Sequence, residues 1–168
     1  MRKLLLLIGI LASGLRVTAY SNYNQMKDTV PSAKEECEAL LNYVLPFAEK
    51  FLQEQGEFFP FGAVMKTNRE MVSVAGHDGR EQPPSDDVIR ILKEGFIEGA
   101  KNGSYRATAL AYDVRITAPA GEKQDAIAIA LDHPREYSVI VYFPYRMVDG
   151  ILSIGEPMAN NGTGGIFH

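Results

Sequence analysis

The sequence predicts an α+β domain in which a five-stranded antiparallel sheet packs with two main helices. Three observations support this prediction. Two segments repeat apolar residues at helical spacing, five others have the apolar pattern of strands, and the connections between consecutive strands are short and rich in turn residues. The expected order is α-β-β-α-β-β-β. Tandem hairpins imply antiparallel pairing, and helices packed on such a sheet give an α+β architecture.

The first 19 residues have the layout of a secretory signal peptide. Arg2 and Lys3 precede an apolar run over residues 4–15, and the small-residue pattern VTA at 17–19 suits signal peptidase. The run is too short to cross a bilayer, which needs about 20 apolar residues. We therefore expect a periplasmic or secreted protein with no stable membrane anchor after cleavage. A buried first helix is the alternative interpretation.

Composition and charge restrict the classes of partner. With 46% hydrophobic and 23% charged residues, the chain has the composition of an ordinary globular protein. Removal of the first 19 residues would change the formal net charge from −4 to −7, which argues against nucleic acid as a partner. We expect a linker at residues 20–30, a single domain at 31–152 and a flexible tail, rich in Gly and Asn, at 153–168.

The first helix is the clearest element. Ser32 and Glu35 have the spacing of a capping box, and apolar residues at helical spacing follow as far as Gly56. Pro46 interrupts the pattern, and a proline costs about 3 kcal/mol in a helix interior. We therefore expect a kink at this position or two abutting helices.

The second helix is predicted to begin with a cap at Ser85 and to close at Gly103. Gly95 and Gly99 both lie inside it, and each costs about 1 kcal/mol relative to alanine. We expect these two glycines to mark a close approach of backbones.

The strands are predicted at residues 58–66, 70–76, 105–117, 125–133 and 137–145. Two of them, 105–117 and 125–133, carry alanines on one face and large aliphatic residues on the other. We expect like stripes to lie together, so that the alanine face carries helices. The face of large residues then needs a cover, which could be a helix, a second copy of the chain or a ligand. The alternative is that each helix takes one face.

Seven residues are candidates for binding: Phe59, Phe61, Tyr112, Asp113, Arg115, Tyr142 and Tyr145. Most of the aromatic candidates lie in EFFPFG and VYFPYR, where prolines within strands indicate edges or bulges that can serve as recognition surfaces. The two charged candidates share the alanine face of their strand, close enough to interact with each other or with a neighbouring strand. An ordinary aromatic core with edge prolines is the alternative.

No catalytic residue and no cofactor is predicted. Cys37 is the only cysteine, which excludes an internal disulfide, and its place on the apolar face of a helix should raise its pKa. The sequence has no G-x-S-x-G elbow, Walker loop or G-x-G-x-x-G. The alternative is a metal site or a hydrolase site formed, if two strand ends converge, by His77, Asp78, Asp132 and His133.

Four segments resemble a family of small uncharacterised bacterial proteins, a domain of unknown function: PFGAVM at 60–65, ALAYDVRI at 109–116, DAIAIALDH at 125–133 and YFPYR at 142–146. The resemblance covers about residues 38–146. It implies a bacterial domain and supplies no mechanism or site residues. Separately, the order of elements is similar to that of roadblock and profilin-like domains, which are interaction modules.

The sequence therefore favours an exported bacterial protein that uses a sheet face to bind a protein partner or a second copy of itself. Whether the protein is an enzyme stays open, and a non-enzymatic binding domain is the preferred hypothesis. The alternative is a small hydrolase or metal-dependent enzyme that uses the two His and Asp pairs.

Overall fold

The structure is a computed structural model that describes residues 30–118 and 121–167. The expected signal peptide and nearly all of the expected linker lie outside the described residues. The contacts divide the chain between Pro31 and Ser32, and every element described below belongs to the second unit. No helix in the described part of the chain is long and apolar enough to cross a membrane.

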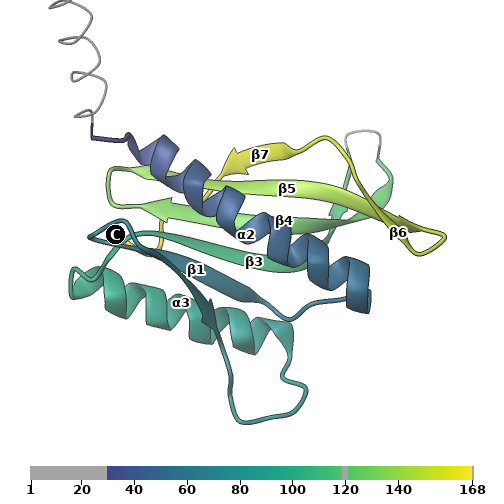
Figure 1. The fold of residues 1–168 in the computed structure, drawn as a ribbon, viewed down its shortest axis with the longest axis horizontal. Coiled ribbons are helices and arrows are strands. Elements are labelled where there is room, and N and C mark those ends of the chain that lie inside the picture. The colour runs from purple at the N-terminus through teal and green to yellow at the C-terminus, as the bar shows by residue number, and fades with distance from the viewer. Residues whose placement is uncertain (1–29, 119–120, 168) are drawn as a thin grey trace, which may run out of the picture. The chain divides into compact units, whose positions relative to one another are not determined.

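The described residues contain α2 (Ala33–Gln55), β1 (Phe61–Lys66), β2 (Met71–Ala75), α3 (Ser85–Lys101), β3 (Tyr105–Thr117), β4 (Lys123–His133), β5 (Tyr137–Val148), β6 (Ile151–Ile154) and β7 (Met158–Asn161). The strands form one antiparallel sheet in the order β2-β1-β3-β4-β5-β6, and β7 also pairs with β5 (Figure 1). The α+β class with an antiparallel sheet is confirmed. The predicted count of five strands is not confirmed, because β6 and β7 enlarge the sheet.

The ends of α2 agree with the sequence prediction. The Ser32 hydroxyl accepts a hydrogen bond from the Glu35 backbone N–H at 3.2 Å, and the Glu35 carboxylate accepts one from the Ser32 N–H at 2.6 Å. The helix ends at Gly56, whose φ of 79° is left-handed. Pro46 lies within one continuous helix, so of the two outcomes expected, a kink or two abutting helices, the second is wrong. Buried residues before and after the proline hold both halves of α2 on the sheet.

The start and the glycines of α3 differ from the prediction. Ser85 is the first helical residue, and Pro84 occupies the cap position without a side-chain hydrogen bond. Gly99 does mark a close approach, but of a side chain and not of a backbone, because a Cβ there would lie 2.0 Å from the ring of Tyr105. The same prediction is wrong for Gly95, where a Cβ would meet nothing within 4 Å.

The register of β3 and β4 overturns the expected pairing of like stripes. Ala111 lies opposite Ile129, and Leu110 lies opposite Ala130. The alanines of β3 and the large aliphatic residues of β4 therefore share one face, and the reverse holds on the other face. Small residues beside large ones give both faces a mixed apolar surface on which a helix can pack.

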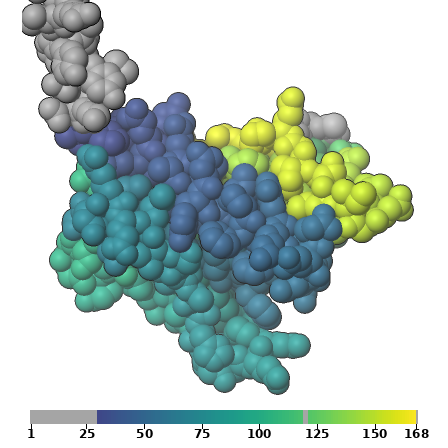
Figure 2. Space-filling view, viewed as in Figure 1, coloured from purple at the N-terminus to yellow at the C-terminus, as the bar shows by residue number. Residues whose placement is uncertain are grey.

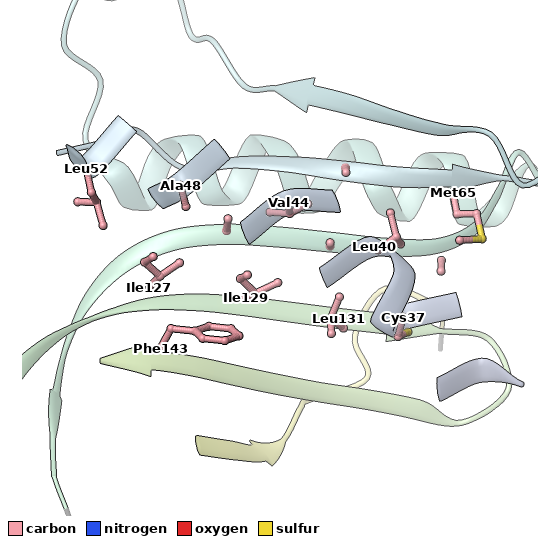
Figure 3. Close-up of a cluster of buried hydrophobic side chains, with 14 residues drawn as sticks. Cys37, Leu40, Val44, Ala48, Leu52, Met65, Ile127, Ile129, Leu131 and Phe143 are labelled. Atoms are coloured by element: carbon pink, nitrogen blue, oxygen red, sulfur yellow. The ribbon is translucent and has the colours of Figure 1, made fainter. Parts of the chain in front are cut away.

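The first face is covered by α2. Figure 3 shows Leu40, Val44, Ala48 and Leu52 following one another along the helix above Ile127, Ile129 and Leu131 of β4. Ile129 is 0% exposed. Of the three possible covers, a helix, a second copy or a ligand, the structure shows the chain's own helix on this face. The alternative, in which each helix takes one face, is confirmed.

The second face is covered by α3 over β1 and β3. The helix packs Val88, Leu92 and Phe96 against these two strands. It lies close to the sheet because Gly62 has no side chain. A Cβ on Gly62 would lie 2.5 Å from the Phe96 ring and 2.7 Å from the Ala109 carbonyl oxygen. The main contacts of α3 end at β3, so β4 and β5 depend on other groups for cover on this side.

Two short strands share the outer edge of β5. Residues 145–148 of β5 pair with β6, and residues 139–142 pair with β7. At the break between them, the Pro144 carbonyl accepts a hydrogen bond of 2.7 Å from the Gly155 N–H. The N–H and C=O of a strand residue face the same neighbour, so the N–H that proline lacks would face this break. The prediction of a flexible tail at 153–168 is wrong for residues 158–161, which form β7.

Candidate functional site

A groove lies on the second face of the sheet, beside α3. It has a volume of about 310 Å³. Its walls are α3 and the C-terminal segment, and its floor is formed by β3, β4 and β5. The residues that line it are Ile89, Lys93, Ile97, Tyr112, Ala130, Asp132, Ser138, Ile140, Gly162, Thr163, Gly165 and Ile166. We call this feature the α3 groove.

Two of the predicted binding residues lie on this face. Tyr112 lines the α3 groove, and the register places Tyr142 two strands away with Ala128 between them. Burial raises the pKa of Tyr112, and the nearby Tyr142 adds to that rise. The phenol of Tyr112 is therefore a neutral hydrogen-bonding group at neutral pH, next to an apolar floor.

Three other predicted binding residues lie on the opposite face. The Tyr145 hydroxyl donates to both carboxylate oxygens of Asp113 at 3.1 Å, and Arg115 pairs with Asp125 at 3.5 Å. Burial raises the pKa of Asp113 despite the bond from Tyr145. The structure therefore separates these charged candidates from Tyr112, and the seven residues do not form one site.

Of the two phenylalanine candidates, Phe59 lies ahead of β1 and Phe61 is the first residue of β1. Phe61 packs edge-on against Phe51 and Phe58, with ring centroids 5.8 Å apart in both pairs. It belongs to the core under α2. Phe59 is 52% exposed. The alternative of an ordinary aromatic core therefore applies to Phe61 and not to Phe59.

The two His and Asp pairs do not converge. His77 and Asp78 follow β2, whereas Asp132 and His133 end β4, and the antiparallel register puts these two strand ends at opposite ends of the sheet. Asp78 instead pairs with Arg80. The described residues contain no group of three or more His, Cys, Asp or Glu side chains able to hold a metal ion. The combined site proposed for these four residues is therefore wrong.

His133 instead belongs to a buried polar cluster around Glu36. Arg106 Nε lies 2.6 and 2.7 Å from the two carboxylate oxygens of Glu36, and His133 Nε2 lies 2.8 Å from one of them. Arg135 and Arg69 stand farther from the carboxylate, at 3.6 and 3.9 Å. We call these five residues the Glu36 cluster. It joins the N-terminal part of α2 to two strands and two hairpin turns.

Hydrogen bonds fix the charge states in the cluster. The Arg135 backbone N–H donates to His133 Nδ1 at 3.1 Å, so the proton of the neutral imidazole sits on Nε2 and faces Glu36. Burial tends to raise the pKa of Glu36, which is 2% exposed. The hydrogen bonds from His133 and Arg106 outweigh burial and hold this pKa below its usual value. One carboxylate therefore faces three guanidinium groups.

A β-bulge brings Arg106 to the carboxylate. The pairing of β3 with β1 skips Arg106, which makes it the extra residue of the bulge. Tyr105 packs with the core under α3 and Ala107 with the core under α2, although residues two apart in a regular strand share a face. The bulge therefore turns the start of β3 so that Arg106 meets Glu36.

Four members of the cluster were not among the residues predicted from the sequence: Glu36, Arg69, Arg106 and Arg135. The sequence did contain a signal that Glu36 is buried. Glu36 precedes Leu40 by four residues and therefore lies on the apolar stripe of its helix. A charged residue on such a stripe needs a buried partner. No residue pattern marks the bulge that supplies Arg106.

Cys37 lies beside the cluster and is fully buried. Burial, followed by the negative charges of Asp132 and Glu36, raises its pKa to about 12. The predicted rise is confirmed, and the thiol stays protonated at neutral pH.

No known protein family, curated protein or solved structure matches this chain. The resemblance to a family of small bacterial proteins and the analogy with roadblock and profilin-like domains therefore stay predictions. The function has to be argued from the geometry of the α3 groove and the Glu36 cluster.

Proposed function

We propose that this protein is a non-enzymatic binding domain that holds a protein partner in the α3 groove. The observation behind the proposal is the partial cover of the second sheet face. The main contacts of α3 are with β1 and β3, and the groove opens beside it over β4 and β5. Apolar side chains from three directions line it, among them the half-buried Ile97 and Ile140 and the buried Ile166.

The lining defines the chemistry of the partner. A volume of about 310 Å³ is at the lower end of ligand clefts and accommodates one or two large side chains. Lys93 and Asp132 supply one positive and one negative group among the apolar residues. Tyr112 supplies a neutral aromatic ring with a hydroxyl, the kind of group that is enriched at protein interfaces. The partner is therefore a protein segment with an apolar anchor flanked by polar residues.

Site-specific crosslinking tests this proposal. A photoreactive amino acid in place of Ile140, in the full chain made by its natural host, should give a discrete adduct with one partner protein. The matched control is the same replacement at Leu152, a half-buried apolar residue on the opposite face of the sheet. The adduct from position 140 should disappear when Ile97→Ser alters the opposite wall of the groove.

Two results would contradict the proposal. Equal adducts from positions 140 and 152 would show nonspecific proximity, and the absence of any adduct from position 140 would show that the groove holds no protein. An adduct between two copies of this chain would show that the groove mediates self-association and does not hold a separate partner protein.

The proposal includes export to the periplasm or the outside of the cell, supported by the arrangement of residues 1–19. The protein purified from its host should begin at Tyr20, as read by mass spectrometry of its N-terminal peptide, and should be found outside the cytoplasmic fraction. Leu7→Arg interrupts the apolar run and should leave the N-terminus unprocessed in the cytoplasm. A wild-type protein that keeps residues 1–19 in the cytoplasmic fraction would contradict export.

A further inference from the structure

Arg69 occupies a backbone position that does not favour arginine. It closes the turn between β1 and β2, where its N–H donates to the Lys66 carbonyl at 2.9 Å and its φ is 68°. This left-handed conformation suits glycine or asparagine better than a residue with a long side chain. The turn itself gains nothing from arginine, so the reason for arginine at this position lies in its guanidinium.

The hydrogen-bonding capacity of Glu36 is used mainly by other residues. Its two oxygens already accept bonds from Arg106 Nε and His133 Nε2 at 2.6–2.8 Å. Arg69 Nε, at 3.9 Å, lies within ion-pair range but beyond hydrogen-bonding distance. Among the described residues, the Arg69 guanidinium has no hydrogen-bond acceptor, and its side chain is 50% exposed.

The neighbouring carboxylates do not supply an acceptor either. Glu70, the next residue, accepts hydrogen bonds from the side chains of Lys66 at 3.1 Å and Asn68 at 3.4 Å. Glu38 on α2 pairs with Lys34 at 3.6 Å. The donors of Arg69 therefore face solvent at a place where Arg106 and Arg135 already approach the same carboxylate.

We propose that the Glu36 cluster is an oxyanion site, in which Arg69 binds a carboxylate or phosphate group of a small ligand. The planar fork of a guanidinium matches two oxygens of either group, and Arg106 and Arg135 add positive charge beside it. Glu36 and the neutral His133 hold Arg106 in place from the buried side. This site uses different residues from the α3 groove, so its test is independent of the test of the proposed function.

Thermal unfolding of the full chain with added anions tests the site. Inorganic phosphate and sodium acetate are titrated in separate arms at constant ionic strength set with sodium chloride. We expect at least one anion to raise the Tm in a saturable way. A response to phosphate alone assigns a phosphate group, and a response to acetate alone assigns a carboxylate group.

Arg69→Gly is the decisive variant because it keeps the left-handed turn while removing the guanidinium. Its Tm without added anion should equal or exceed that of the wild type, and its apparent affinity for the anion should fall at least about tenfold. Asp149→Gly is the matched control. Asp149 also has a positive φ, of 52°, but lies in the turn between β5 and β6 at the other end of the sheet. Its anion response should be that of the wild type.

Arg69→Asn provides a second variant with the same backbone preference. The proposal is overturned if neither anion gives a saturable shift in the wild type. It is equally overturned if Arg69→Gly and Arg69→Asn respond to the anions as the wild type does. NMR adds a direct readout, because the Nε–Hε resonance of Arg69 should shift along the same binding curve.

Discussion

Ile129→Glu is expected to prevent the domain from folding. Ile129 is 0% exposed and lies beneath α2 in the centre of the largest core cluster. The introduced carboxyl group would be buried in either its ionised or its protonated form, and no described polar group lies around it as a partner. Either state costs a large part of a typical folding free energy of about 5–15 kcal/mol. Circular dichroism and thermal melting of the purified variant measure the result.

Ile140→Glu is the matched control for this prediction. Ile140 lies on the neighbouring strand but on the opposite face, where it is half-buried at the rim of the α3 groove. An introduced carboxylate can reach water there, so the variant should fold and melt cooperatively. A cooperatively folded Ile129→Glu protein with wild-type Tm would show that α2 does not cover this face.

Glu36→Gln is expected to reduce the free energy of unfolding by about 3 kcal/mol. The substitution removes the negative charge that Arg106, Arg69 and Arg135 approach, and it leaves Arg106 without a charged partner in a mostly buried place. Removing one member of a buried ion pair costs more than the pair itself contributes, because the other charge stays desolvated. Urea denaturation at pH 7 measures the loss.

The same substitution should change how stability depends on pH. The pKa of Glu36 lies below its usual value, so its contribution to stability is present above the pKa of the unfolded chain, about 4.3. The contribution is lost as the pH falls through the lower pKa of the folded protein. The stability difference between wild type and Glu36→Gln should therefore be constant near neutral pH and shrink below about pH 4.

Asp113→Asn is the control for the pH experiment. The pKa of Asp113 is raised, mainly by partial desolvation of a carboxyl that still reaches water, so its ionised form opposes folding slightly at neutral pH. Asparagine can still accept the hydrogen bond from Tyr145, so this variant should equal or exceed the wild type in stability at pH 7. A loss for Glu36→Gln that stays the same down to pH 3 would contradict the role assigned to the Glu36 charge.

The fold class could be predicted because its determinants are local. The capping box at Ser32 and the left-handed glycine at position 56 set the two ends of α2, and the apolar spacing between them sets its buried side. The register of β3 against β4 could not be predicted in the same way. The alternation of small and large residues along each strand allows two registers, one with Ala111 opposite Ile129 and one with Ala111 opposite an alanine. Only packing against both helices decides between them.

The candidate sites were less predictable than the fold. Tyr112 and Tyr142 do share a face, but Asp113 and Tyr145 belong to the other one, which alternation along each strand already requires. The Glu36 cluster depends on residues far apart in the sequence, such as Glu36 and His133 at 97 positions, and on a bulge that no residue type marks. The alternative site, which needed His77 and His133 to converge, failed because it depended on the strand order, which the sequence did not determine.

The two edges of the sheet limit how a partner can be recognised. One edge is β2, with five residues, and the other is divided between β6 and β7, with four residues each and a break at Gly155. Edges this short and interrupted offer few consecutive free peptide groups, which is how natural sheets avoid recruiting strands from other chains and growing into fibrils. β-Augmentation is therefore disfavoured for this domain, and the protein partner proposed above would have to be recognised through side chains, which can discriminate between partners in a way that backbone pairing cannot.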